Sequence, residues 1–279
     1  MALFTSTGSA ILRPDEVGPL IVQPVQAAAV ATQVAQTVTT RSHEFRVPIV
    51  AADPTAGWVA EGGEIALSDA DLDEVTITPA KVAGLTVITR ELAEDSDPAA
   101  ARVVGDGLSR DIARRLDEAF FGALAAPAPA GLESMAGVTE QTYATPVADL
   151  DAFAAAIAAG EQEGVSVSSF VTDPATALTL SQLKEGNASA RPLLGQDPTR
   201  PSSRVILGVP LYVSTAVTAG TVWAIPRTRV MVVMRNNATL ETSREAYFSS
   251  DQIAIRATMR VGFAFPHPAA IVKITEAVG

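Results

Sequence analysis

The sequence predicts an α+β protein in which one long helix lies against long strands and a smaller helix-and-strand region follows. Residues 98–121 carry the clearest helical pattern, with an apolar side chain at every fourth position. Residues 252–265 alternate apolar and polar side chains, as one very long strand does. A third stretch, at about 58–74, is acidic and has too few apolar residues to form a core of its own. We therefore expect an elongated body with one segment that extends away from it.

The long helix is expected to begin after Asp97, a preferred N-cap residue, with Pro98 at the first helical position. At ~1.5 Å per residue it would be roughly 36 Å long. The long strand would reach about 46 Å at ~3.3 Å per residue, so we expect the two elements to pack together. The apolar stripe of the helix consists of Val104, Leu108, Ile112, Leu116 and Phe120, and the arginines Arg102, Arg110, Arg114 and Arg115 lie largely off it.

The acidic stretch connects a strand predicted at 43–50 to a return strand that begins at Val75. Most strand connections take about 2 to 5 residues, and much longer ones tend to be functional. Trp58 is the expected anchor of a contact with another copy of the chain, since tryptophan is enriched among dominant interface residues. Carboxylates would meet helix arginines of that copy. The expected contact residues are Trp58, Glu61, Glu64, Asp71, Asp73 and Glu74 on this segment and Arg102, Arg110, Arg114 and Arg115 on the helix.

Residues 1–40 begin with small and polar residues and are punctuated by Pro14, Pro19 and Pro24, which indicates an extended arm with a short helix within 25–38. Two interpretations remain open: a partly disordered terminus, or an arm that becomes ordered only against neighbouring subunits.

The remainder of the chain alternates short helices and strands. Helices are expected at 149–163 and 174–184, and strands at 168–172, 205–207, 211–214, 221–225 and 230–234. The expected organisation is an N-terminal arm at 1–45, an extended loop at 46–80, a first domain with the long helix at 81–138, a second domain at 139–235, and long strands with a C-terminal strand at 236–279.

Composition excludes several classes of protein. The 279 residues are 48% hydrophobic, which argues against a disordered chain. There is no cysteine, so disulfides and thiolate metal sites are excluded. The formal net charge of −11 argues against a nucleic-acid-coating protein, which would carry basic patches. No apolar run of about 18 residues is present, and no membrane partner is expected.

We find no constellation of catalytic residues. His43 lies within a predicted strand and His267 lies between two prolines, and no nucleophile elbow or phosphate-binding loop is present. Alternate aspartates at 69–73 lack the glycine and closing glutamate of a calcium loop. A hydrolase that uses Glu161 and Glu163 is the remaining enzymatic alternative, but their spacing points the two side chains in different directions on a helix. We expect no enzyme, no cofactor and no metal.

An ordered set of short motifs resembles the tailed-phage major capsid protein family, which has the Hong Kong 97-type fold. The motifs are Arg-Val-Pro-Ile at 46–49, Trp-Val-Ala-Glu-Gly-Gly at 58–63, Val-Thr-Ile-Thr-Pro-Ala-Lys-Val-Ala-Gly at 75–84, Thr-Arg-Glu-Leu at 89–92 and Asp-Glu-Ala-Phe-Phe-Gly at 117–122. Ser-Arg-Glu at 243–245, the long strand and residues 266–274 resemble the carboxyl-terminal part of the family, so the likeness extends over about 46–275.

The resemblance implies a role for each part. Residues 46–80 would be the family's extended loop, a β-hairpin that lies across the adjacent subunit, and 98–121 the spine helix of its peripheral domain. Residues 139–235 would be the α/β axial domain, which meets its copies around five-fold and six-fold axes. Pentamers and hexamers would then form an icosahedral virion shell, assembled in the bacterial cytoplasm. It would enclose double-stranded DNA without sequence-specific binding, with scaffolding, portal and decoration proteins as candidate partners. An encapsulin-type nanocompartment, which shares the fold, is the main alternative.

Two features depart from some members of that family. Members that join subunits covalently use a lysine in the extended loop, whereas no lysine lies between Glu61 and Thr78, and Lys81 comes only at the start of the return strand. We therefore expect no such bond. About 45 residues precede Arg46, so a scaffold is expected to be a separate protein or unnecessary.

Overall fold

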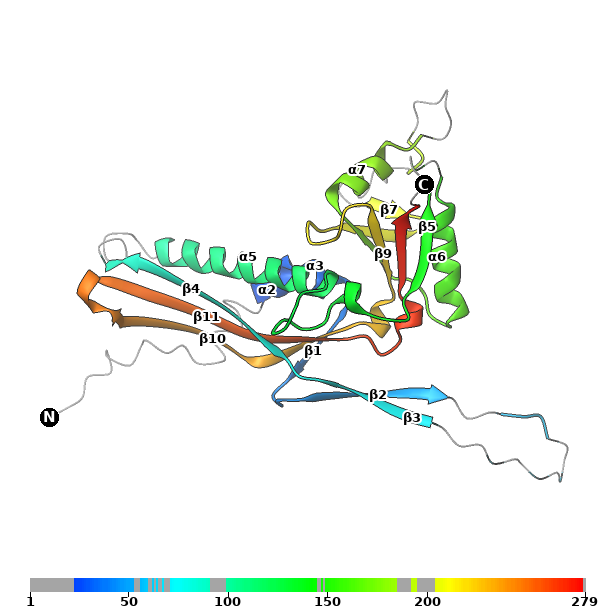
Figure 1. The fold of residues 1–279 in the computed structure, drawn as a ribbon, viewed down its shortest axis with the longest axis horizontal. Helices are drawn as coiled ribbons and strands as arrows, with labels where there is room; N and C mark the ends of the chain where they lie inside the picture. The colour runs from blue at the N-terminus through cyan, green and yellow to red at the C-terminus, as the bar shows by residue number, and fades with distance from the viewer. Residues whose placement is uncertain are drawn as a thin grey trace.

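The computed structural model describes residues 23–52, 56–59, 62, 64, 67, 71–90, 99–144, 147, 149–184, 192–194 and 204–277. Figure 1 shows an elongated molecule in which helix α5 (Ala99–Phe121) runs lengthwise over long strands, with a second group of strands and helices at one end. A separate two-stranded hairpin extends from the body (Figure 1). The mixture of sheets and helices is the α+β class that the sequence predicts.

The long strands form a four-stranded sheet in the order β1-β10-β11-β4. Its strands are β1 (Gln36–Thr40), β10 (Met231–Tyr247), β11 (Gln252–Ala264) and β4 (Ala80–Thr89). The strand predicted at 252–265 is thus confirmed as β11. The short strand predicted at 230–234 differs: it is the beginning of the 17-residue β10, which pairs antiparallel with β11 in this sheet.

The main core lies between α5 and one face of this sheet. Ile112, Leu116 and Phe120 of the predicted stripe are buried there. The Phe120 ring meets Phe263 of β11 edge to face, with ring centroids 5.1 Å apart, so helix and long strand do pack together. Asp97 and Pro98, the expected start of the helix, lie outside the described residues.

The segment before β1 packs against its own chain, whereas the sequence predicts an extended arm. Helices α2 (Gln23–Ala28) and α3 (Val30–Val34) contribute the buried residues Val25, Ala31 and Val34 to the core beside α5. Strand β1 then pairs in parallel with β10. Residues 23–40 are therefore ordered against their own chain and need no neighbour.

The second group is a six-stranded sheet in the order β5-β12-β9-β6-β8-β7, flanked by α6 and α7 (Figure 1). Its core includes Phe153 of α6, Phe170 of β6 and Ile274 of β12. These elements are β5 (Thr139–Tyr143), α6 (Asp151–Gln162), β6 (Ser169–Thr172), α7 (Pro174–Gln182), β7 (Arg204–Ile206), β8 (Val209–Val213), β9 (Thr221–Ile225) and β12 (Val272–Glu276).

Short connections complete the described chain. Single 3-10 turns lie at Leu132–Ser134, Arg227–Arg229, Phe248–Ser250 and Pro268–Ala270. Helix α7 begins as its sequence predicts, because the Asp173 side chain accepts hydrogen bonds from the backbone N–H groups of Ala175 and Thr176. Among the residues that the structure describes, every helix is too short or too polar to cross a lipid bilayer.

Candidate intersubunit surfaces

The projecting hairpin consists of β2 (Phe45–Ala52) and β3 (Asp71–Ile77), paired antiparallel with Phe45 opposite Ile77. Its base is fixed to the body where Val47 and Ile77 pack against Ala264 at the end of β11. A Cβ atom on Gly262 would lie 2.5 Å from the Ile77 side chain, so glycine is needed for this close approach. The hairpin is therefore held firmly at its base while its strands leave the body (Figure 1).

The segment beyond the two strands presents apolar side chains to solvent. Trp58 is fully exposed and Leu67 is 93% exposed. Exposed apolar patches mark interaction surfaces more often than scattered apolar residues do, and Trp58, Val59 and Leu67 are all exposed within this short segment. The structure thus places Trp58, the anchor predicted from the sequence, where it makes no core of its own chain. Glu64 is exposed in the same segment, and Glu61 lies outside the described residues.

The carboxylates of β3 are partly neutralised within the chain. Glu74 forms an ion pair with Arg46 across the hairpin, at 3.1 Å between Oε1 and Nη1. Both side chains are exposed, so the pair contributes only about 0–1 kcal/mol. Asp73 is exposed and accepts a hydrogen bond from the backbone N–H of Glu74. The side chain of Asp71 is outside the described residues.

The arginines of α5 already have partners on the same helix. Arg114 lies 2.6 Å from the Asp111 carboxylate, and Arg115 lies 2.9 Å from that of Glu118. Arg110 is exposed, and the side chain of Arg102 is outside the described residues. Among the side chains that the structure describes, these arginines do not meet the hairpin acids within one copy. The contact between the two sets in neighbouring copies stays a prediction.

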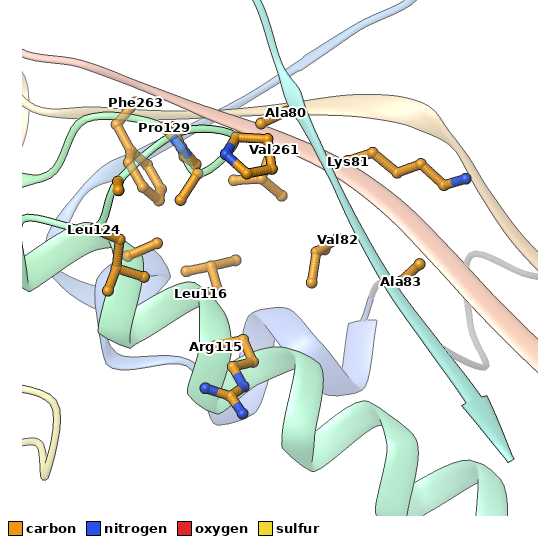
Figure 2. A pocket seen from close by; sticks show the side chains of 14 residues that line it. Ala80, Lys81, Val82, Ala83, Arg115, Leu116, Leu124, Pro129, Val261 and Phe263 are labelled. Atoms are coloured by element: carbon orange, nitrogen blue, oxygen red, sulfur yellow. The ribbon is translucent and has the colours of Figure 1, made fainter.

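A cavity of about 470 Å³ lies between α5, β4 and the segment 124–129. In Figure 2 the Val82 and Leu116 side chains point into it, whereas Lys81 points away from it. The lining is largely apolar. It includes Val82, Leu116, Leu124, Pro129, Val261 and Phe263. Sequence reasoning missed this cavity because it is built from four segments, one of them β11, that only the fold brings together.

A buried carboxylate, also missed from the sequence, joins α3 to α5. The two oxygens of Asp117 accept hydrogen bonds from the backbone N–H groups of Val30 and Ala31, at 3.0 and 2.9 Å. These are unpaired donors at the beginning of α3, which a carboxylate satisfies. The sequence holds a signal for it, since Ala113, Asp117 and Phe121 form a second buried column, four residues apart, next to the predicted stripe.

Asp117 is expected to make stability depend on pH. Burial raises its pKa from 3.8 to about 6, more than the hydrogen bonds from Ala31 and Val30 lower it. A raised pKa means that the folded state holds a proton which the unfolded state releases, so this contribution is present below about pH 4 and lost as pH rises through 6. We expect the difference in unfolding free energy between wild type and Asp117→Asn to fall by up to about 3 kcal/mol over that range.

Denaturant unfolding of both proteins at several pH values checks this expectation. Asp117→Asn removes the ionisable carboxyl group but keeps one side-chain oxygen that can accept a hydrogen bond from the N–H groups at the beginning of α3. Arg110 and Arg114 line the same 280 Å³ hollow as Asp117. A wild-type-to-variant difference that stays constant with pH would contradict the assignment.

The other ionisable clusters have structural partners. Lys273 lies 2.6 Å from Glu133 and 5.5 Å above the centre of the Trp223 ring. Glu163, considered above as a hydrolase residue, lies 3.3 Å from His267. In the part of the chain that the structure describes, no group of three or more histidine or acidic side chains could hold a metal ion. In this part of the chain the ionisable side chains named above are therefore paired with one another within the fold.

Comparisons with known proteins show the family of this chain. The model of the phage capsid family matches residues 10–275. A capsid polyprotein of Pseudomonas phage PAJU2 is 35% identical over 156 residues, which covers 52% of this chain and 23% of the polyprotein. The chain thus spans about a quarter of the length of that curated relative.

Solved structures match most of the fold. A structure from Mycobacterium phage Bobi aligns with a TM-score of 0.74 at 17% identity, over 90% of this chain and 91% of that one. One from Microbacterium phage Oxtober96 gives 0.73 at 20% identity over the same shares. The capsid of a native GTA particle gives 0.68 at 19% identity, over 88% of this chain and 89% of that one. At such identities the likeness shows the fold.

Proposed function

Because this chain belongs to the phage capsid family and has the Hong Kong 97-type capsid fold, we propose that it is the major subunit of a closed icosahedral shell around double-stranded DNA. It is a capsid protein, a structural component of the virion that assembles into an oligomeric shell. The finer points are proposals: pentamers and hexamers as the building units, assembly in the bacterial cytoplasm, no catalytic activity, and scaffolding, portal and decoration proteins as further partners.

One observation carries the proposal. A rigidly based hairpin leaves the body and leads to a segment in which Trp58 and Leu67 are exposed to solvent. A buried tryptophan removes about 150–250 Å² from water, which at about 25 cal/mol per Å² corresponds to roughly 4–6 kcal/mol before the costs of association. An isolated subunit gains none of this free energy, because Trp58 stays in water. In a shell the free energy would be gained at every contact where a neighbouring subunit covers the segment.

The parts of the chain would make different contacts in the shell. The core beside α5 also includes Val171, Trp223 and Ile225 of the six-stranded sheet, which contributes to a second core as well. We therefore expect each subunit to fold before it assembles. We propose that the 46–80 segment lies across the neighbour, and that the six-stranded sheet with α6 and α7 meets its copies around the symmetry axes. The acidic carboxylates of the hairpin would then set register and partner choice, because exposed ion pairs add little strength.

Negative-stain electron microscopy of the purified protein tests this function. We expect closed, uniform, hollow particles that sediment far faster than the 28.9 kDa chain. Particles that enclose a cargo enzyme and no DNA after expression in a phage infection would point instead to a nanocompartment. A protein that stays monomeric at high concentration, with or without the other phage head proteins, would overturn the proposal.

A further inference from the structure

Residues 23–40, called the clasp below, consist of α2, α3 and β1. The buried apolar side chains of the clasp belong to the core that also contains side chains of α5, of β10 and of β9 in the six-stranded sheet. Figure 1 shows α2 and α3 beside α5, and β1 leads from them onto the four-stranded sheet. The clasp therefore packs into a core that both parts of the body share.

Hydrogen bonds within the clasp hold its two helices together. The Thr32 hydroxyl group of α3 lies 2.6 Å from the carbonyl oxygen of Gln26 and 2.7 Å from that of Ala29. The Gln33 side chain donates to the Ala27 carbonyl oxygen at 3.0 Å. Each helix alone is far below the length that is stable in water. Because α3 is bonded back to α2 at these points, we expect the two helices to dock and to leave together.

Polar contacts with the body hold the clasp at both ends of α3. At its beginning, Asp117 of α5 accepts hydrogen bonds from the backbone N–H groups of Val30 and Ala31. Since α3 has no side-chain cap of its own, this carboxylate takes the place of an N-cap. At its end, the Arg227 guanidinium group donates to the Ala35 carbonyl oxygen at 3.3 Å, and β1 then pairs with β10. Ionisable groups of the body thus bond directly to the clasp backbone.

Asp117 is the buried ionisable group beneath the clasp, only 7% exposed. Residues 23–40 contain no charged side chain. Of the described side chains that line the hollow beside Asp117, those of α2 and of the 214–216 segment are uncharged, and Arg110 and Arg114 come from α5 itself. Burial raises the pKa of Asp117 to about 6, more than its two hydrogen bonds lower it. We expect the carboxyl group to return to water when the clasp leaves, so its charged form favours the open clasp.

We propose that the clasp opens as a unit while α5 and the two sheets stay folded, and that loss of the Asp117 proton promotes this opening. The closed clasp is the arrangement that the structure shows, and the open clasp is the extended arm that the sequence predicts for this part of the chain. The switch belongs to the single subunit, so it goes beyond the proposed function and does not rest on it.

Proton binding sets the direction of the effect. The closed clasp keeps the Asp117 proton up to a pKa of about 6, whereas in the open clasp the carboxyl group has its ordinary pKa of 3.8. Closure is therefore favoured most below about pH 4, and this contribution is lost as pH rises through 6. Because the two pKa values differ by about two, the equilibrium constant for opening should rise roughly 100-fold over that range. Local opening of this kind costs less free energy than global unfolding.

Thiol labelling of the folded, unassembled full-length subunit tests the proposal, because the chain has no cysteine of its own. Ala29→Cys and Ala35→Cys each place one thiol in the clasp, and Ala177→Cys places one in the core of the six-stranded sheet as the matched control. All three alanines have no exposed surface, so a pyridyl disulfide reagent reaches each thiol only when its surroundings open. Dividing each rate by that of an unstructured thiol peptide at the same pH gives the opening constant, because it removes the effect of thiol ionisation.

We expect equal opening constants for the two clasp thiols, at least about tenfold above that of Ala177→Cys at neutral pH. Both should rise roughly 100-fold from about pH 4 to pH 7, and adding Asp117→Asn should make them independent of pH. Equal constants at all three positions would mean that the clasp opens only with global unfolding, which overturns the proposal. So would unequal constants for the two clasp thiols, or a pH dependence that persists with Asp117→Asn. A chain that forms no shells contradicts the proposed function and leaves these outcomes unchanged.

Discussion

Replacing Trp58 with alanine is expected to abolish closed shells and to leave a folded, dispersed subunit. Trp58 contributes nothing to the core of its own chain because its side chain is fully exposed. Its removal therefore costs little in the free energy of unfolding of a single subunit, within about 0.5 kcal/mol for an exposed position. The same change at a central interface anchor commonly costs about 2 kcal/mol or more per contact. Repeated at every subunit contact, that loss is larger than a shell can sustain.

Sedimentation and negative-stain microscopy measure the shells, and thermal unfolding measures the subunit. Trp58→Phe is the matched control, because it keeps a large aromatic surface and should retain a substantial part of the assembly. Shells formed by Trp58→Ala in the yield of the wild type would show that another residue anchors the contact. A variant that fails to fold would show that Trp58 belongs to the core after all.

Replacing Phe120 with alanine is expected to lower the free energy of unfolding by about 3–5 kcal/mol, as large-to-small changes of buried aromatic residues do. Phe120 has no exposed surface, and its ring lies 4.9 Å from Phe121, 5.1 Å from Phe263 and 5.7 Å from Phe265. The void left by the missing Phe120 ring would remove the contact between the end of α5 and β11. A loss of this size is a large share of the stability of a typical domain.

Denaturant unfolding of unassembled subunits checks this value, since the shell would add stability by mass action. Leu178→Ala is the control: Leu178 is 55% exposed on α7, and its truncation should change stability by no more than about 0.5 kcal/mol. Equal effects of the two substitutions would mean that the contact between α5 and β11 is not the centre of the core.

Periodicity explains why the two longest elements could be predicted. In α5 the stripe of Ile112, Leu116 and Phe120 repeats at one helical face, and β11 places apolar side chains at every second position from Ile253 to Phe263. Its partner β10 could not be recognised beyond its first residues. The register shifts between Arg235 and Thr239 and between Ser243 and Tyr247, and each shift resets the alternation on which the prediction depends.

The N-terminal helices show a different limit. α2 and α3 have six and five residues, well below the length at which a helix is stable in isolation. Their burial depends on α5 and on the Asp117 carboxylate, which follows them by more than eighty residues in the chain. No local pattern in 23–40 contains that information, so the sequence indicates an arm with a short helix but not its burial in the core.

The intersubunit role of the candidate surface stays a prediction, and only part of this surface stands out in the sequence. Composition alone pointed to Trp58 and to the acids around it, because they have no local partners in the sequence. Their counter-charges were assigned to the helix, although the spacing of Asp111, Arg114 and Glu118 at three and four residues already favours pairs within the helix. Three further cations, Arg235, Arg260 and Lys81, lie directly opposite one another across the four-stranded sheet. Their proximity cannot be found from spacing in the sequence, because they become neighbours only through the strand register.

The order of strands in the six-stranded sheet has a consequence for synthesis on the ribosome. β5 lies at one side of that sheet and pairs in parallel with β12, whose residues follow roughly 130 positions later in the chain. At ordinary elongation speeds of about 5–20 residues per second, β5 waits on the order of ten seconds for its partner. During translation the nascent chain therefore carries an open strand edge, and this domain acquires its final form only when β12 has left the exit tunnel.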